Sequence, residues 1–408
     1  MSIQGAELGR NRANLTLAAL FLGTFVLGCA ELLVVGVLDL IAADLRVSIP
    51  AAGTLVTAYA LGIAIGGPLL TASTIRLNRR FVLIGSVAAF IVAVLVPVLV
   101  PSFGLFVAAR AVAGAVQGLF IAVAFVTAMS VVPKERAGRA ISMVLSGVAV
   151  SAALGVPLGT LLGQGLGWRG SFVAIVAFAV LALVAAVAVV PSVPGSGDDV
   201  VGQVRYAFAP RVLAVLGLSC VVFASLYSAL TYIVPFLREV TGITGATVSL
   251  FLFAYGAATA VGSFGGGRFA DKNAARALVV ATVGTAVALL VLYLVGSSPV
   301  LVALVLLVWG VFAFGMTPSL QLRVVSLAGP GGQLASSLPA SAVNVGVALG
   351  PIAGGLAISR SPSAPVLVGL GIAVLGIAVA LATSRLRPPV VEEQAERDAE
   401  SEPAAEAA

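Results

Sequence analysis

Twelve long apolar runs, separated by short polar breaks, make up most of the chain. Each run is close to the 20 or so apolar residues that cross a bilayer as a helix. The apolar residues are continuous rather than alternating, which favours helices over the strands of a membrane barrel. The runs are Leu15–Val37, Ala51–Thr71, Phe81–Val100, Phe103–Val132, Ile141–Leu166, Ser171–Val190, Val212–Leu237, Thr247–Gly266, Ala277–Val295, Val300–Leu320, Ser337–Ile358 and Ala364–Thr383. The pattern predicts an all-α membrane protein with twelve transmembrane helices.

Composition points the same way. Of the 408 residues, 60% are hydrophobic and 9% are charged, and the mean hydropathy is +1.17. A soluble protein has about 25% charged residues, and one this apolar would expose large patches and aggregate. These values exclude a soluble enzyme, a nucleic-acid-binding domain and a disordered chain.

The net charge of +6 reflects membrane topology rather than a nucleic-acid partner. Seventeen of the 22 Lys and Arg residues lie in breaks on one side of the runs or in the terminal segments of that side, and four lie on the other side. Because positive residues concentrate on the cytoplasmic side, we expect both termini in the cytoplasm and a multi-pass protein of the cell's inner (plasma) membrane.

Two halves are expected from the break pattern and from an internal repeat. The motif Gly155-Val156-Pro157-Leu158-Gly159 lies in the fifth run, and the related Gly350-Pro351 lies in the eleventh. The first and seventh runs begin about as far apart as Gly155 and Gly350 do, which is typical of internally repeated transporters. We therefore predict an N-terminal six-helix bundle (1–190), a cytoplasmic linker (191–210), a C-terminal six-helix bundle (211–387) and a disordered acidic cytoplasmic tail (388–408).

Four local motifs occur in matching runs. The eleventh run has G-x-x-x-G-P-x-x-G-G at 346–355, and the fourth has R-x-x-x-G-x-x-Q-G at 110–118. Gly267, Asp271, Lys272 and Arg276 form G-x-x-x-D-K-x-x-x-R after the eighth run, and Gly167-Trp168-Arg169 precedes the sixth. Together these motifs resemble the major facilitator superfamily, and within it the twelve-helix drug:proton antiporters of the sugar and chloramphenicol efflux type. In the first half, Thr71 stands where the superfamily has an Asp.

The resemblance implies two pseudo-symmetric six-helix bundles that rock around a central cavity. It also implies conformational gating at the motif residues, although tight static packing would place glycines and prolines there as well. The gating candidates are Gly155, Pro157, Gly159, Gly267, Asp271, Lys272, Arg276, Gly346, Gly350, Pro351, Gly354 and Gly355.

Few ionisable groups lie inside the runs. The chain has no His, so proton chemistry near neutral pH falls to carboxylates in altered surroundings. Glu31 lies about 9 Å below the outer end of the first run, and Arg110 lies about 10 Å below the outer end of the fourth. Asp39 lies roughly on the same helix face as Glu31. We expect Glu31, Asp39 and Arg110 to couple protons, with Glu31 and Arg110 linked directly or through water.

Structural roles for these three residues stay open. Glu31 could hydrogen-bond a neighbouring helix, Asp39 could be a solvated helix end, and Arg110 could hold helices together.

Aromatic and polar side chains within the runs are candidates for a cargo cavity with apolar walls and a few polar anchors. These are Gln117, Phe120, Tyr227, Tyr232, Phe236, Phe253, Tyr255, Phe314 and Asn344.

These features together with the resemblance predict a secondary active transporter that exports small amphipathic compounds, such as the antibiotic chloramphenicol, in exchange for protons. The alternative is export of a sugar or a nucleoside-like metabolite on the same fold.

We expect no enzyme, because a membrane enzyme needs clustered His, Asp or Glu. No phosphate-binding loop or ring of charges indicates a pump or channel. Cys29 and Cys220 lie inside runs and indicate no disulfide or metal site. The expected partners are a small-molecule substrate, protons and the bilayer, without cofactor or nucleic acid, and the chain is expected to be a monomer.

Overall fold

The computed structural model describes residues 10–133, 136–194, 205–206, 208–329, 335 and 338–389, and these form helices joined by short connections. The helices of the first half are α1 (Arg10–Gly36), α2 (Leu38–Leu45), α3 (Ile49–Leu61), the π-helical η1 (Gly62–Gly66), α4 (Gly67–Thr74), α5 (Arg79–Leu99), α6 (Phe103–Ser130) and α7 (Ala137–Val189). Those of the second half are α9 (Pro210–Leu230), α10 (Ile233–Glu239), α11 (Ala246–Leu294), α12 (Pro299–Gly315), α13 (Thr317–Ala328), α15 (Leu338–Ile358) and α16 (Ala364–Ser384). The all-α prediction is confirmed.

Ten helical segments within the described ranges are long and apolar enough to cross a bilayer. Two of them each hold two of the predicted runs. One is α7, which leaves helical geometry at Gly167, and the other is α11, which does so at Asn273. Gly167 has a φ of 69°, a value that glycine adopts without strain. Dividing these two helices at their kinks yields the twelve spans that the sequence predicted.

Three predicted spans are interrupted rather than continuous. The seventh run divides into α9 and α10 shortly before Pro235, and the tenth divides into α12 and α13 shortly before Pro318. Proline cannot donate the main-chain hydrogen bond that would continue the helix. In the second run, α3 and α4 are joined by η1. Its Gly62 lies so close to α6 that an added Cβ would approach the oxygen of Ala111 to 2.1 Å.

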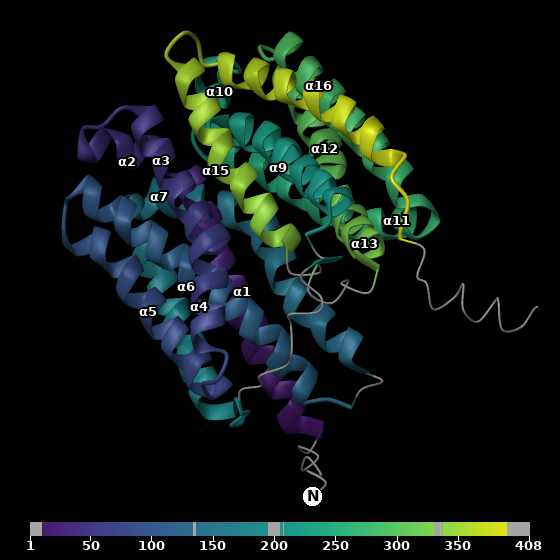
Figure 1. Cartoon of the computed structure of the whole chain (residues 1–408). Coiled ribbons are helices and arrows are strands. Elements are labelled where there is room, and N and C mark those ends of the chain that lie inside the picture. The colour runs from purple at the N-terminus through teal and green to yellow at the C-terminus, as the bar shows by residue number, and fades with distance from the viewer. Residues whose placement is uncertain are drawn as a thin grey trace, which may run out of the picture.

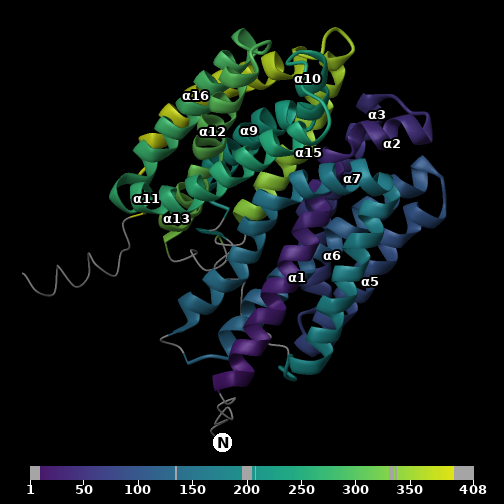
Figure 2. The same cartoon turned by 180° about the vertical axis from the view of Figure 1, so that it is seen from behind.

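The helices form two groups. Figures 1 and 2 show α1–α7 (purple to blue-teal) on one side of the molecule and α9–α16 (teal to yellow) on the other. In the first group α1 lies along α7 and α5 along α6, and in the second α9 lies against α15 and α16. Large apolar side chains such as Val92, Leu181 and Leu356 are exposed, as expected where lipid replaces water.

Contacts between the two groups gather at the end of the molecule where α2, α3 and α10 lie. There α3 contacts α15, α10 contacts α1 and α2, and α7 contacts α11. Thr57 donates to the main-chain oxygen of Ala348 at 2.9 Å, and Gln164 donates to that of Gly245 at 2.9 Å. Residues 195–204 and 207 of the predicted linker and 390–408 of the predicted tail lie outside the described residues.

Candidate functional site

Glu31 lies on α1 with its side chain directed at α6. The amide nitrogen Nε2 of Gln117 donates to Oε2 of Glu31 at 2.7 Å. The Gln117 side chain is buried, and Glu31 is half-buried. Within the described part of the chain, the carboxylate of Glu31 forms no ion pair with Lys or Arg. An ionisable group inside the membrane is therefore held by a neutral partner.

Arg110 binds main-chain oxygens instead of the carboxylate. Its guanidinium donates to Leu55 at 3.2 Å, to Ala30 at 2.9 Å and to the main-chain oxygen of Glu31 at 3.1 Å. The planar fork of an Arg suits several acceptors at once. Of the two links expected between Arg110 and the Glu31 side chain, the direct one is replaced by a contact with the Glu31 main chain, and the link through water stays a prediction. Helix depth predicted the shared level but could not predict which way the side chains turn.

Tyr59 on α3 completes this cluster, and the sequence analysis did not select it. Its hydroxyl donates to Oε1 of Gln117 at 2.6 Å and lies 3.3 Å from the oxygen of Leu27. The guanidinium of Arg110 lies 3.9 Å from the centre of the Tyr59 ring, a cation–π arrangement. Glu31, Gln117, Tyr59 and Arg110 therefore form one connected polar cluster. A lone Tyr within an apolar run was the available signal.

Asp39 lies on α2 rather than in the cluster. A break in the helix at Val37 separates α1 from α2, and the Asp39 carboxylate forms an ion pair with Arg238 on α10. The two residues belong to opposite halves, so this pair joins the halves. The second carboxylate oxygen of Asp39 is buried without a partner among the described residues. A second pair, Asp44–Arg169 at 2.6 Å, lies wholly within the first half.

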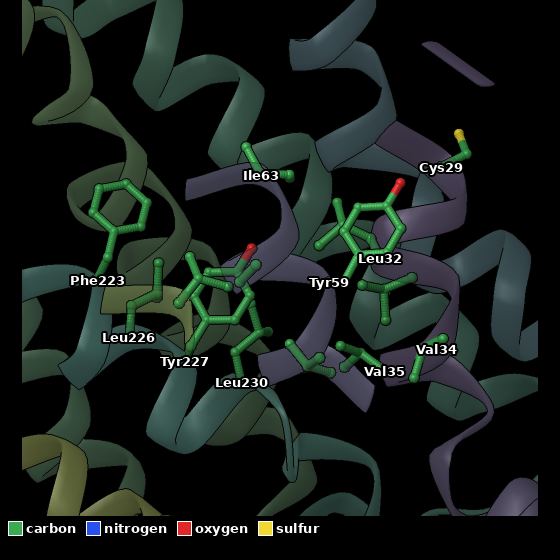
Figure 3. Packing of buried hydrophobic residues seen from close by; sticks show 14 of the residues in the cluster. Cys29, Leu32, Val34, Val35, Tyr59, Ile63, Phe223, Leu226, Tyr227 and Leu230 are labelled. Atoms are coloured by element: carbon green, nitrogen blue, oxygen red, sulfur yellow. The ribbon is translucent and has the colours of Figure 1, made fainter. Parts of the chain in front are cut away.

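One of the cargo candidates from the second half, Tyr227, lies near the cluster, and a second, Tyr255, lies near Tyr227. Tyr227 on α9 is buried within electrostatic range of Glu31 and of Tyr255 on α11. Figure 3 shows Tyr227 and Leu230 of α9 in the same hydrophobic cluster as Tyr59. The Tyr255 ring lies 5.0 Å from that of Trp309, and neither polar tip has a partner in the described part of the chain.

Most other cargo candidates are packed inside one half in this state. Phe120 packs against Gly23, and Phe236 packs against Gly296. The ring centres of Phe314 and Phe223 are 6.1 Å apart. The Tyr232 hydroxyl donates to Pro351 at 2.7 Å, so it is already engaged.

The two remaining candidates differ from these. The Asn344 amide nitrogen donates within its own helix, to Ala340 at 2.9 Å, and its Oδ1 is buried without a described partner. Phe253 is 48% exposed and faces outward, where it lines a groove of about 360 Å³ between α7 and α11. Tyr232 and Phe236 are therefore buried instead of being open to a cargo, and Tyr232 lies between the two halves.

The motif glycines mostly lie inside a half. An added Cβ would meet α1 at Gly155 and Gly159, and α9 at Gly346, Gly350 and Gly354. Gly355 is the exception, because it faces Pro50 of the first half as well as Tyr232. These five glycines therefore bring helices together within a half rather than at the interface between the halves, and their role in conformational gating stays a prediction. Pro157 and Pro351 lie inside helices α7 and α15.

A different glycine lies at that interface. On Gly256 of α11, an added Cβ would lie 2.0 Å from the oxygen of Ala153 on α7. Gly267 is half-buried with open space around it. Asp271, Lys272 and Arg276 are exposed around the kink at Asn273, whose side chain accepts from the main-chain nitrogen of Arg276 at 2.9 Å. These three charged side chains form no ion pair with other described residues.

Comparison with known proteins identifies the class. A model of the Major Facilitator Superfamily matches residues 20–337. The inner membrane transport protein YdhP of Escherichia coli (strain K12) is 31% identical over 386 residues, covering 93% of this chain and 98% of that protein. A chloramphenicol resistance protein of Streptomyces lividans is 32% identical over 344 residues, covering 83% and 88%.

The solved structures agree on the fold. A bacterial homologue of the human lysosomal transporter Spinster, inward-facing and occupied, has a TM-score of 0.80 and 17% identity, covering 93% of this chain and 98% of that one. This chain belongs to the Major Facilitator Superfamily. It is a multi-pass membrane protein with the twelve-helix, two-bundle fold of these transporters, a family of transporters rather than enzymes.

Proposed function

We propose that this transporter exports small amphipathic compounds, of which chloramphenicol is an example, in exchange for protons. The observation that carries the proposal is the placement of Glu31 inside the membrane, where a neutral amide holds its carboxylate. Intramembrane carboxylates are costly and mark ion and proton pathways. The relative named a chloramphenicol resistance protein supports this cargo class.

The cluster suits a group that gains and loses a proton. Arg110 is anchored by main-chain oxygens of α1 and α3, so neutralising Glu31 breaks no ion pair and leaves that anchor in place. Burial in apolar surroundings favours the protonated form of a carboxyl, and the nearby positive charge opposes this. Glu31 takes up a proton when the cavity faces outward and cargo leaves. It releases that proton when the cavity faces inward and cargo binds.

The state described here is closed at the outer end, on the orientation that the basic residues predict. With both termini in the cytoplasm, the Asp39–Arg238 pair and the Gln164–Gly245 hydrogen bond lie at the extracellular end. The halves meet at that end, and we infer that cargo reaches Glu31 from the cytoplasm in this state. The inner membrane is the expected location, consistent with the name of YdhP.

The residues around Glu31 favour an uncharged amphipathic cargo over a sugar or nucleoside. Near Glu31 the second half contributes Tyr227, and Tyr255 lies near Tyr227; both are large aromatic side chains with a single polar tip. A sugar needs many hydrogen-bonding side chains around it. Aromatic walls with few polar anchors are typical of sites for drug-sized apolar compounds.

The experiment that tests the proposal uses protein reconstituted in liposomes with an imposed proton gradient. We expect labelled chloramphenicol to accumulate against its own gradient, in the direction opposite to proton flow. An ionophore that collapses the proton gradient should abolish accumulation. Chloramphenicol movement that does not depend on the proton gradient would indicate a uniporter. Accumulation of a labelled nucleoside without chloramphenicol would assign the other cargo class.

A further inference from the structure

We propose that Gln117 is a positioning residue whose side-chain amide turns over when Glu31 gains or loses a proton. This turn reverses the direction of the hydrogen bond between Gln117 and Tyr59. This inference rests on the proposed proton coupling through Glu31. In the arrangement shown, Gln117 uses its nitrogen toward Glu31 and its oxygen toward Tyr59. One amide therefore lies between a titrating group and a hydroxyl, with opposite hydrogen-bonding capacity at its two ends.

Protonation of Glu31 adds a hydrogen-bond donor to the carboxyl. An ionised carboxylate only accepts hydrogen bonds, whereas the protonated acid also has an O–H to donate. A half-turn of the Gln117 amide places Oε1 toward Glu31, where it accepts that new donor. Amide oxygen and nitrogen are nearly equal in size, so the half-turn requires little movement of the surrounding atoms.

The far end of the amide then donates to Tyr59 instead of accepting from it. The Tyr59 hydroxyl can accommodate this because a second acceptor lies within reach. The main-chain oxygen of Leu27 is 3.3 Å from Oη, against 2.6 Å for Oε1 of Gln117. After the half-turn, Tyr59 accepts from Nε2 of Gln117 and donates to Leu27. Both protonation states thus leave no buried polar group of the cluster unpaired, which is the condition for two stable arrangements.

The scaffold around this switch is rigid. Gly114, one helical turn from Gln117, allows the main chains of α6 and α3 to touch. A Cβ added to Gly114 would lie 2.0 Å from the main-chain oxygen of Tyr59. The amide can therefore turn while its helices stay in place.

The Tyr59 end of the switch lies on the helix that joins the halves. Thr57, two residues before Tyr59 on α3, donates to Ala348 in the second half. Protonation of Glu31 thereby changes a hydrogen bond on the helix that contacts the other half.

Among the described residues, the charged and titratable groups that face Glu31 are few. Arg110 comes from α6, Tyr59 from α3 and Tyr227 from α9. Tyr227 lies within electrostatic range of Glu31 and has no hydrogen bond to Gln117 in this structure. It is therefore an internal control for the relay through Gln117.

The test uses full-length protein in detergent with its six tyrosines labelled with ¹³C at Cζ, observed by NMR across a pH titration. Loss of a signal in Tyr59→Phe and in Tyr227→Phe identifies the two resonances. In wild type we expect the Tyr59 resonance to move between two values and to move further than that of Tyr227. In Glu31→Gln both should stay constant.

The decisive variant is Gln117→Leu. We expect the change at Tyr59 to fall to no more than that at Tyr227, while Tyr227 keeps responding to Glu31. An unchanged response of Tyr59 in Gln117→Leu would overturn the relay. If that variant does not fold, a Tyr59 resonance that stays constant in wild type while Tyr227 titrates overturns it equally. Constancy of both resonances in wild type, with chloramphenicol-induced proton release unaltered by Glu31→Gln, would instead refute the coupling role of Glu31.

Discussion

Arg110 donates to the main-chain oxygen of Glu31 at 3.1 Å, while the carboxylate of the same residue accepts from Gln117 at 2.7 Å. The positive charge and the ionisable group are therefore adjacent but not paired. Arg110 holds α1, α3 and α6 together through carbonyl oxygens, whose acceptor capacity is the same at any pH. Glu31 is left free to change its charge without releasing the helices.

Replacing Arg110 by Lys keeps the charge but removes the fork that reaches three carbonyl oxygens. We expect Arg110→Lys to lower the free energy of unfolding by about 2–3 kcal/mol, since one hydrogen bond to a charged group contributes about 1.5–3 kcal/mol. Thermal unfolding of the purified protein in detergent measures the loss. Arg360→Lys, at an exposed position, is the matched control. Equal melting temperatures for both variants would show that only the charge of Arg110 matters.

Breaking the ion pair between Asp39 and Arg238 should open the outer end. The pair is partly exposed, with Arg238 at 31% and Asp39 at 19%, so we expect it to contribute about 1 kcal/mol. Asp39→Asn should then raise the ratio of outward-open to closed molecules about fivefold. Distances between spin labels at Ala43 on α2 and Glu239 on α10 report the two populations.

Two controls separate this effect from a general loss of charge. Asp44→Asn removes the pair with Arg169, which lies within one half, and should leave the distances between the labels unchanged. Exchanging the charges, Asp39→Arg with Arg238→Asp, should restore the closed population. A closed population that is insensitive to Asp39→Asn would show that this pair does not hold the outer end shut.

Gly256 brings the main chain of α11 into close contact with that of α7. A Cβ there would lie 2.0 Å from the oxygen of Ala153, and main chain cannot yield as a flexible side chain does. We expect Gly256→Ala to destabilise this state by about 1–3 kcal/mol and to slow transport. Gly265→Ala on the same helix meets open space and should transport like wild type. Equal transport rates for the two variants would show that the contact does not limit the cycle.

The sequence was sufficient to predict the number, type and order of the membrane-spanning segments, because a spanning helix must be long, continuous and apolar. It did not predict the breaks near Tyr232 and Met316, although Pro235 and Pro318 were visible. A proline removes one hydrogen bond, and whether the helix then bends or breaks depends on its neighbours.

The site was predictable in part for a similar reason. A lone carboxylate in an apolar run identified Glu31, and helix rise put Arg110 at its depth. Rise along an axis says nothing about how two helices are rotated, so Gln117 was not recognised as the partner of the carboxylate. Tyr59 and Gly256 owe their importance to what another helix places against them. Residue type and spacing do not carry that information.

The central claim is that Glu31 carries the coupled proton, and cargo-induced proton release tests it most directly. Purified wild type, Glu31→Gln and Asp39→Asn are each mixed with chloramphenicol in weakly buffered detergent solution, and the pH change is recorded. The account predicts release from wild type, none from Glu31→Gln and retained release from Asp39→Asn, because Asp39 is engaged with Arg238. Undiminished release from Glu31→Gln would contradict it.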